Sequence, residues 1–138
     1  MKTNVKQLAF AAPVLFAILI IFNSFKPAQR NSIANGGGIA GDVHFNLNAV
    51  EQKDGAIVGH IQYGDASYNV ECAEWFGTSA ILYTDGGVAF LVTDNGEGSS
   101  GVADVISEPY DAVCGDDLTP ADFLDLNDVT SGNIQVKE

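Results

Sequence analysis

The stretch that decides the fold is AILYTDGGVAFLVTDNGEGSSGVADVISE, residues 80–108. It contains three apolar runs, rich in β-branched and aromatic residues, and two turn signals separate them. The first turn, DGG at 85–87, predicts a tight hairpin because glycine accepts a positive φ. The runs on either side of it, 81–84 and 88–93, are apolar at successive positions, which is typical of strands covered on both faces. The stretch therefore predicts the central antiparallel strands of an all-β domain.

The chain before this stretch predicts further strands. Residues 42–49 and 57–63 alternate between apolar and polar positions, and the Lys-Asp-Gly turn between them favours a hairpin. A third run, 68–74, places Cys72 on the same face as two apolar residues, so we expect this cysteine to point inward. The aromatic pair at 75–76 should divide between core and surface, because neighbours in a strand point to opposite sides.

The chain after the central stretch loses strand character over residues 110–131. Within it, Thr-Pro-Ala-Asp at 119–122 predicts a helix start, with threonine as the cap and proline at the first helical position. Residues 132–136 predict a last strand. The total of about seven or eight antiparallel strands predicts an all-β sandwich or small barrel, with one short helical turn near the C-terminus.

The N-terminal residues 1–30 differ in composition from the rest. Two lysines precede an uncharged apolar run of fifteen residues, 8–22, and a lysine and an arginine follow it. This order is typical of an export signal, and the run is shorter than the roughly 20 residues of a membrane-spanning helix. No clean cleavage site follows, so a retained single-pass anchor stays open; no cysteine is placed for a lipoprotein anchor. We interpret 31–38, which ends in three glycines, as a linker and 39–138 as one β-domain.

The two cysteines, Cys72 and Cys114, predict a disulfide, because an exported chain meets an oxidising compartment. A metal thiolate or a nucleophilic cysteine would need a histidine or a second cysteine pair nearby in the sequence, and neither is present. In the chain-entropy account, closing this loop stabilises the fold by roughly 4 kcal/mol.

The charge distribution excludes some partners. Beyond residue 30 only Lys53 and Lys137 stand against eighteen acidic residues, a formal balance of −16. We expect no nucleic-acid binding and no adsorption to anionic lipid, since lysine and arginine mainly hold such partners. Membrane contact is expected only through residues 1–30. The acidity either keeps an exported monomer soluble or attracts cations or a basic partner.

Four short features have an order similar to that of a known family. They are GGG at 36–38, GHIQY at 59–63, VTDNGEG at 92–98 and GNIQV at 132–136. In this order they resemble small exported bacterial all-β domains, sometimes labelled post-COAP type. The resemblance implies a secreted β-domain without an established activity. The acidic segment from 116 to 128 departs from the family's pattern.

A calcium site is one hypothesis for the loop after the second central strand. Carboxylate and amide oxygens suit this hard cation, and the glycine-rich backbone could complete six to eight ligands. The spacing is not that of an EF-hand, and Asp-Asn-Gly is equally a turn signal. A second group of acidic residues has two interpretations: solvent-exposed side chains around a short helix, or another calcium site. The residues are Asp94, Asn95, Glu97 and Asp104 in the first group, and Asp116, Asp117, Asp122, Asp125 and Asp128 in the second.

Four side chains are candidates for ligand binding. His44 and His60 lie on the outward faces of neighbouring predicted strands, where the register puts His60 across from Asn48, too far from His44 for a shared zinc. Trp75 and Tyr63 are the aromatic candidates, since an exposed tryptophan can stack on a sugar ring.

No catalytic constellation emerges from the sequence. No carboxylate pair lies in an apolar context, and no G-x-S-x-G motif is present. We therefore expect a non-catalytic secreted or cell-surface module for recognition or adhesion, with an extracellular protein or glycan as partner. Two alternatives stay open: a hydrolase or lyase on extracellular polysaccharide, and a structural protein of an envelope or matrix.

Overall fold

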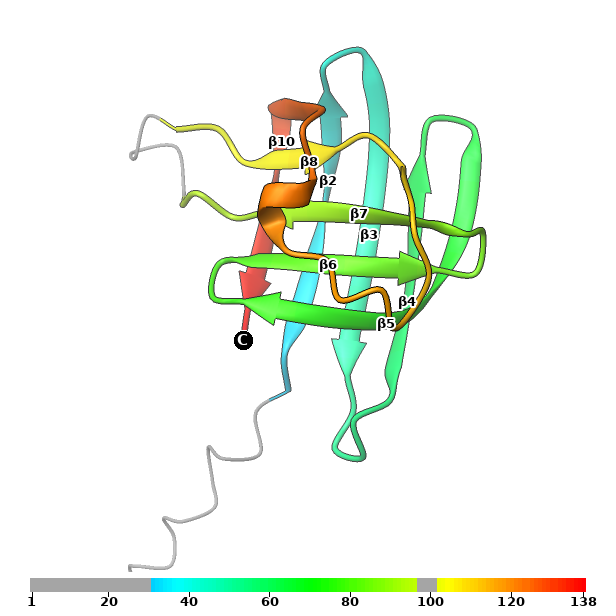
Figure 1. The fold of residues 1–138 in the computed structure, drawn as a ribbon. Helices are drawn as coiled ribbons and strands as arrows, with labels where there is room; N and C mark the ends of the chain where they lie inside the picture. Colours follow the sequence, from blue (N-terminus) through cyan, green and yellow to red (C-terminus); the bar gives the residue numbers. More distant parts are fainter. Residues whose placement is uncertain (1–30, 97–101) are drawn as a thin grey trace, which may run out of the picture. The chain divides into compact units, whose positions relative to one another are not determined.

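The computed structural model describes residues 31–96 and 102–138, so the expected signal or anchor and Glu97 lie outside the described residues. Within these two ranges no helix is both long enough and apolar enough to cross a membrane. The described chain is all-β apart from one 3-10 turn (Figure 1). The elements are β2 (Ile33–Ala40), β3 (Val43–Glu51), β4 (Ile57–Tyr63), β5 (Ala66–Phe76), β6 (Ser79–Thr84), β7 (Val88–Thr93), β8 (Val105–Ser107), β9 (Tyr110–Asp111), η4 (Pro120–Asp122) and β10 (Leu126–Lys137).

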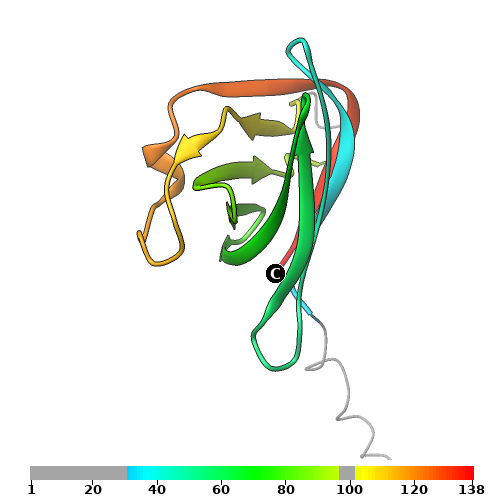
Figure 2. The same cartoon turned by 90° about the vertical axis from the view of Figure 1, so that its right-hand side faces the viewer.

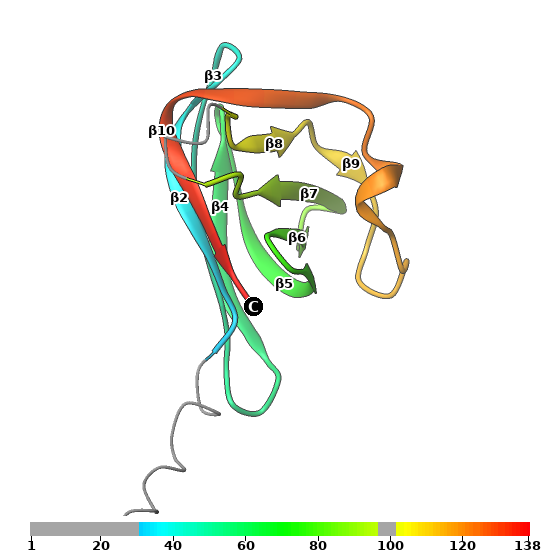
Figure 3. The ribbon, with the colours of Figure 1, turned by 90° about the vertical axis from the view of Figure 1, so that its left-hand side faces the viewer.

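The strands close into an antiparallel barrel. Each strand from β2 to β8 pairs with the next one in the chain, and β10 pairs with both β8 and β2. Eight strands thus form the closed sheet, while β9 is an additional strand beside the start of β7. The predicted all-β class and strand number are confirmed, and the open choice between sandwich and barrel is decided for the barrel. The sheet of β10, β2, β3 and β4 runs across the direction of β5 to β8 (Figures 2 and 3).

Side chains fill the interior of the barrel. The alternating apolar positions of β3 and β4 point inward, as predicted, and the rings of Tyr63 and Tyr68 lie 5.4 and 5.8 Å from the ring of Phe90. The other large buried side chains of this interior cluster include Phe45, Leu47, Ile61, Leu82, Ile106 and Ile134. An eight-stranded barrel is just narrow enough for its own side chains to occupy the centre.

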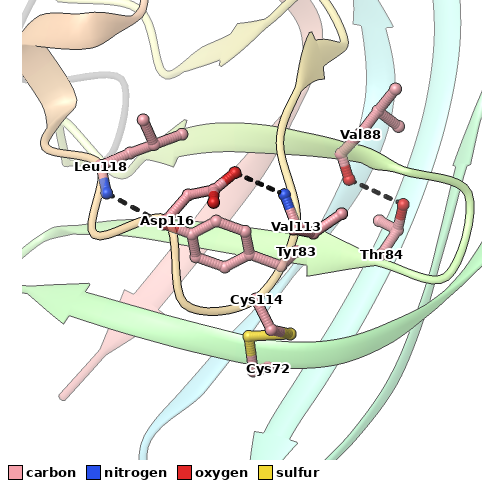
Figure 4. The surroundings of a disulfide bond; sticks show 8 residues. All are labelled: Cys72, Tyr83, Thr84, Val88, Val113, Cys114, Asp116 and Leu118. Atoms are coloured by element: carbon pink, nitrogen blue, oxygen red, sulfur yellow. Dashed lines mark hydrogen bonds between the residues drawn. A yellow bond between two sulfur atoms is a disulfide. The ribbon is translucent and has the colours of Figure 1, made fainter.

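A second apolar cluster lies outside the barrel and covers the outer face of β6 and β7. Residues 108–125 leave the barrel between β8 and β10 and fold back over this face (Figure 4). We call this segment the excursion. The disulfide between Cys72 and Cys114 ties the excursion to β5, with a Cα–Cα distance of 6.1 Å. The cluster comprises Ile81, Tyr83, Ala89, Leu91, Ala112 and Phe123. The predicted disulfide and the prediction that these central strands are covered on both faces are confirmed.

The direction expected for Cys72 was wrong. Val70 and Trp75 both pack against the barrel interior, whereas Cys72 packs against the outer cluster. The pairing of β5 with β6 shifts register between Val70 and Cys72. A β-bulge inserts one extra residue and so exchanges the two faces of the strand beyond it, which strict alternation cannot anticipate.

The interpretation of residues 31–38 as a linker was also wrong. The glycines at 36–38 lie in the middle of β2, between β3 and β10, and the compact unit begins at Asn31. A Cβ atom on Gly36 would collide with the carbonyl oxygen of Asn133, and one on Gly132 would collide with the carbonyl oxygen of Gly37. Glycine is present here because two backbones approach closely, and not because the chain is flexible.

The C-terminal part differs from prediction in extent. The expected helix start is a single 3-10 turn, in which the backbone N–H of Thr119 donates to Asp122 Oδ2 at 2.7 Å. The last strand, expected at 132–136, spans Leu126–Lys137. It pairs first with β8 and then with β2, with a register shift after Val129. Residues 126–131 are mainly polar because their outer sides face solvent.

Candidate binding face

The outward side of five strands, β10, β2, β3, β4 and β5, carries two cross-strand rows of residues that are polar except for Gly37. In each row every residue is the direct cross-strand partner of the next. The first row is Gln135, Asn35, Asn48, His60 and Asn69, and the second is Asn133, Gly37, Asn46, Gln62 and Ser67. We call these ten residues the amide face.

Strand geometry sets the size of the amide face. With strands about 4.8 Å apart, a row over five strands extends about 19 Å, and the two rows lie about 7 Å apart. The residues point outward because their sequence neighbours Leu47, Ile61 and Ile134 are buried in the barrel. The face lies on the opposite side of the barrel from the disulfide-held excursion, as Figures 2 and 3 both show.

Most amide groups of this face have no partner within the described chain. Asn69 Nδ2 donates to Asp85 Oδ2 at 3.1 Å, and Ser67 Oγ lies 3.1 Å from His60 Nε2. The remaining six side chains make no hydrogen bond to any described residue: Asn35, Asn46, Asn48, Gln62, Asn133 and Gln135. Each amide offers two donor hydrogens and an acceptor oxygen to an external partner.

The amide face is also free of ionisable side chains other than His60. None of its ten residues is Asp, Glu, Lys or Arg, although the chain beyond residue 30 carries eighteen acidic residues. The acidic side chain that touches it, Asp85, lies in the turn after β6 and bonds the border residue Asn69. The face is therefore a neutral patch on a strongly negative surface.

The two histidines lie on this side of the barrel, as expected. His60 pairs with Asn48, which confirms the predicted register, and His44 is four residues before Asn48 on β3. The histidines are thus about 14 Å apart along the strands and do not share a ligand. Beside the second row, a hollow of about 120 Å³ is lined by His44, Phe45, Asn46 and Gln62.

Tyr63 and Trp75 lie elsewhere, because both belong to the barrel interior. Tyr63 is only 8 % exposed, and its hydroxyl donates to Glu108 Oε2 and accepts from Asn127 Nδ2, each at 3.1 Å. Burial, followed by the hydrogen bond and the charge of Glu108, raises the pKa of Tyr63 to about 12.

Trp75 is half-buried, and Phe76 beside it is 39 % exposed, so the predicted division of this pair between core and surface is confirmed. The indole N–H of Trp75 is buried and has no hydrogen-bond partner among the described residues. Neither Tyr63 nor Trp75 joins the histidines on the amide face.

The described calcium candidates Asp94, Asn95 and Asp104 lie close together, but the carboxylate oxygens of Asp94 and Asp104 accept hydrogen bonds from backbone N–H groups. Asp104 is 6 % exposed, and its two carboxylate oxygens accept from the N–H groups of Asn95 at 2.8 Å and Ile134 at 2.7 Å. Asp94 accepts from Gly96 at 2.9 Å and from Val136 at 3.2 Å. In the ranges that the structure describes, no three His, Cys, Asp or Glu residues are grouped to hold a metal ion. These contacts favour the reading of the loop as a structural turn.

The second acidic group does not form a site either. Asp116 Oδ2 accepts from the N–H of Val113 at 2.9 Å, and Asp122 holds the N–H of Thr119. Asp117 occupies a left-handed turn position with φ of 54°, and Asp125 and Asp128 are exposed. These side chains stabilise local turns of the excursion or face solvent.

Sequence reasoning identified part of the amide face, since it placed polar residues of β3 and β4 outward. It missed the rows because three consecutive glycines at 36–38 favour a linker, so the sequence does not predict β2 as a strand. A repeated pattern could have indicated them: the triplets NLN at 46–48, HIQ at 60–62, SYN at 67–69 and NIQ at 133–135 all place polar residues on either side of an apolar one.

No family model matches the sequence, and no curated protein or solved structure matches the chain. Function is therefore inferred from the chemistry of the described surface.

Proposed function

We propose that this protein is an exported, non-catalytic recognition module that contacts its partner through the amide face. The observation that carries the proposal is the two-row face itself, with six amide side chains that have no partner in the described chain. The closed barrel holds the backbone of these residues in place, and their unpaired amides are available as donors and acceptors. Little conformational entropy is lost in the backbone when such a surface binds.

Export is supported by two features. The Cys72–Cys114 disulfide is of a kind that persists in oxidising compartments, and residues 1–30 have the composition of an export signal or a single-pass anchor. The resemblance to exported bacterial β-domains of the post-COAP type belongs to the same proposal. We place the protein in the extracellular space, in the periplasm or at the cell surface.

A polysaccharide hydrolase or lyase has less support. That alternative requires a cleft in which Tyr63 or Trp75 faces two carboxylates. Instead, the Tyr63 hydroxyl is held by Glu108 and Asn127, and Trp75 packs in the barrel interior. A structural role in an envelope or matrix would require self-association, which light scattering over a range of protein concentrations would detect.

The test uses a pair of charge-matched double variants. Asn48→Asp with Gln62→Glu adds two negative charges to the amide face, while Asn31→Asp with Gln52→Glu adds the same charges at exposed positions outside it. We expect oxidised full-length protein to bind material from the extracellular fraction of a culture of the organism that naturally makes the protein. The face variant should lose this binding and the control should keep it. Equal binding by both variants would contradict the proposal.

A further inference from the structure

We infer that the partner of the amide face is a neutral, hydroxyl-rich polymer, that is, an uncharged polysaccharide. The inference rests on the proposed function and adds the chemical class of the ligand. It follows from three properties of the face: its charge, its hydrogen-bonding groups and its extent.

Charge selects a neutral partner. The chain beyond residue 30 has a formal balance of −16, so a polyanion is repelled at any approach. A polycation would instead be drawn to the acidic positions, which include Asp111, Asp116, Asp122 and Asp125 on the excursion at the opposite side of the barrel. A second copy of this chain carries the same negative charge, which opposes pairing of two amide faces. A neutral partner can cover the amide face without the free-energy cost of desolvating a charged group.

Hydrogen bonding selects hydroxyl groups. Amide side chains both donate and accept, and so do sugar hydroxyls, so either orientation of a hydroxyl finds a complement. The ten residues include no aromatic side chain except the imidazole of His60, and no aliphatic one. The two rows themselves thus have no large apolar group, although Ile33, Val50 and Val58 form the next outward row beside Asn35, Asn48 and His60. Binding energy within the amide face must come from many polar contacts.

The extent of the face selects a polymer over a single sugar. A net hydrogen bond contributes only about 0.5–1.5 kcal/mol, so the few bonds to one sugar ring do not offset the entropy lost on association. A chain or flat array of chains along rows of about 19 Å engages many amides at once. The hollow beside His44 and Gln62 offers room for a group that projects from such a polymer.

The probes for the experiment are insoluble cellulose, chitin and starch as neutral polymers, and cross-linked polygalacturonate as the anionic one. Oxidised full-length protein is sedimented with each polymer at low and high salt. We expect binding to at least one neutral polymer, with little dependence on salt, and no binding to polygalacturonate. The Asn48→Asp/Gln62→Glu variant should bind at least tenfold more weakly, whereas Asn31→Asp/Gln52→Glu should bind like the unmodified protein.

An Asn48→Ala/Gln62→Ala variant removes hydrogen bonds without adding charge, and it should also bind more weakly. Retained near-ultraviolet circular dichroism of each variant shows that loss of binding is not loss of folding. If extracellular material binds in a face-dependent way but no neutral polymer does, the inference is overturned and the proposed function stands. If binding to a neutral polymer is the same in all variants, the inference is overturned, and if binding to extracellular material is also the same in all variants, the proposed function is overturned with it.

Discussion

Asp104 and Ile134 are thirty residues apart in sequence, and the Asp104 carboxylate accepts the backbone N–H of Ile134 at 2.7 Å. The second oxygen of the same buried carboxylate accepts the N–H of Asn95 at 2.8 Å. One side chain thus joins the segment after β7 to β10, the strand that closes the barrel.

Replacing Asp104 by Asn should therefore lower the free energy of unfolding by about 2 kcal/mol, because an amide has only one acceptor oxygen and its NH₂ group would face a backbone donor. Urea unfolding measures the change. The matched control is Asp65→Asn, an exposed acid in the turn before β5, which should change stability by less than about 0.5 kcal/mol. Equal effects of the two variants would show that the hydrogen bonds of Asp104 contribute little.

Calcium should not change the melting temperature. The oxygens of Asp94 and Asp104 already accept backbone N–H groups, so the loop has its structural partners without a cation. Thermal melts with millimolar calcium and with chelator are expected to coincide, and Asp94→Ala should lower both equally. A calcium-dependent rise that Asp94→Ala abolishes would establish a metal site instead, since a ligand stabilises the state that binds it.

Tyr63 should make the fold sensitive to alkaline pH. Its folded pKa of about 12 lies above the ordinary value of 10, so the folded state holds the phenol proton more tightly than the unfolded state. The associated stability is complete below pH 10 and is lost as the pH rises from 10 towards 12. Unfolding free energies measured over this range should fall more steeply for the unmodified protein than for Tyr63→Phe.

The Glu108→Gln variant separates the causes of this shift. It removes the charge that raises the pKa of Tyr63 but leaves the burial, so ultraviolet titration should give a tyrosine pKa between 10 and 12. A value unchanged from that of the unmodified protein would show that burial and the hydrogen bond, and not the charge of Glu108, cause the shift.

Loss of the Cys72–Cys114 disulfide should destabilise the protein by roughly 4 kcal/mol in the chain-entropy account. The excursion would also be released from the outer face of β6 and β7, where Tyr83 and Phe123 are now buried. The measurement compares urea unfolding of the unmodified protein and of a Cys72→Ala/Cys114→Ala variant. Similar midpoints would mean that packing of the outer cluster alone holds the excursion.

Neighbouring glycines in β2 should respond differently to the same substitution. A Cβ on Gly36 would collide with the Asn133 carbonyl, whereas the closest contact of a Cβ on Gly37 is an ordinary 3.4 Å from the Phe45 carbonyl oxygen. We expect Gly36→Ala to cost about 1–3 kcal/mol or more, as forced overpacking does, and Gly37→Ala to be tolerated. Thermal melts of the two variants provide the comparison. If both melt alike, close approach of β2 and β10 does not require glycine at position 36.

The sequence alone determined what local pattern controls. The runs at 81–84 and 88–93 predicted strands covered on both faces, the alternation in β3 and β4 predicted their inward and outward sides, and two cysteines in an export context predicted the disulfide. Each of these properties depends on residues close together in the chain or on the compartment.

Only the tertiary structure decided the features that depend on distant partners. Three glycines in a row are read locally as flexible, yet the approach of β3 and β10 makes them the middle of a strand. The bulge in β5, which turns Cys72 outward, and the closure of the barrel by β10 likewise depend on pairing. The amide face exists because that closure aligns triplets from opposite ends of the chain. Register between strands is set by long-range packing and hydrogen bonding, which local periodicity does not encode.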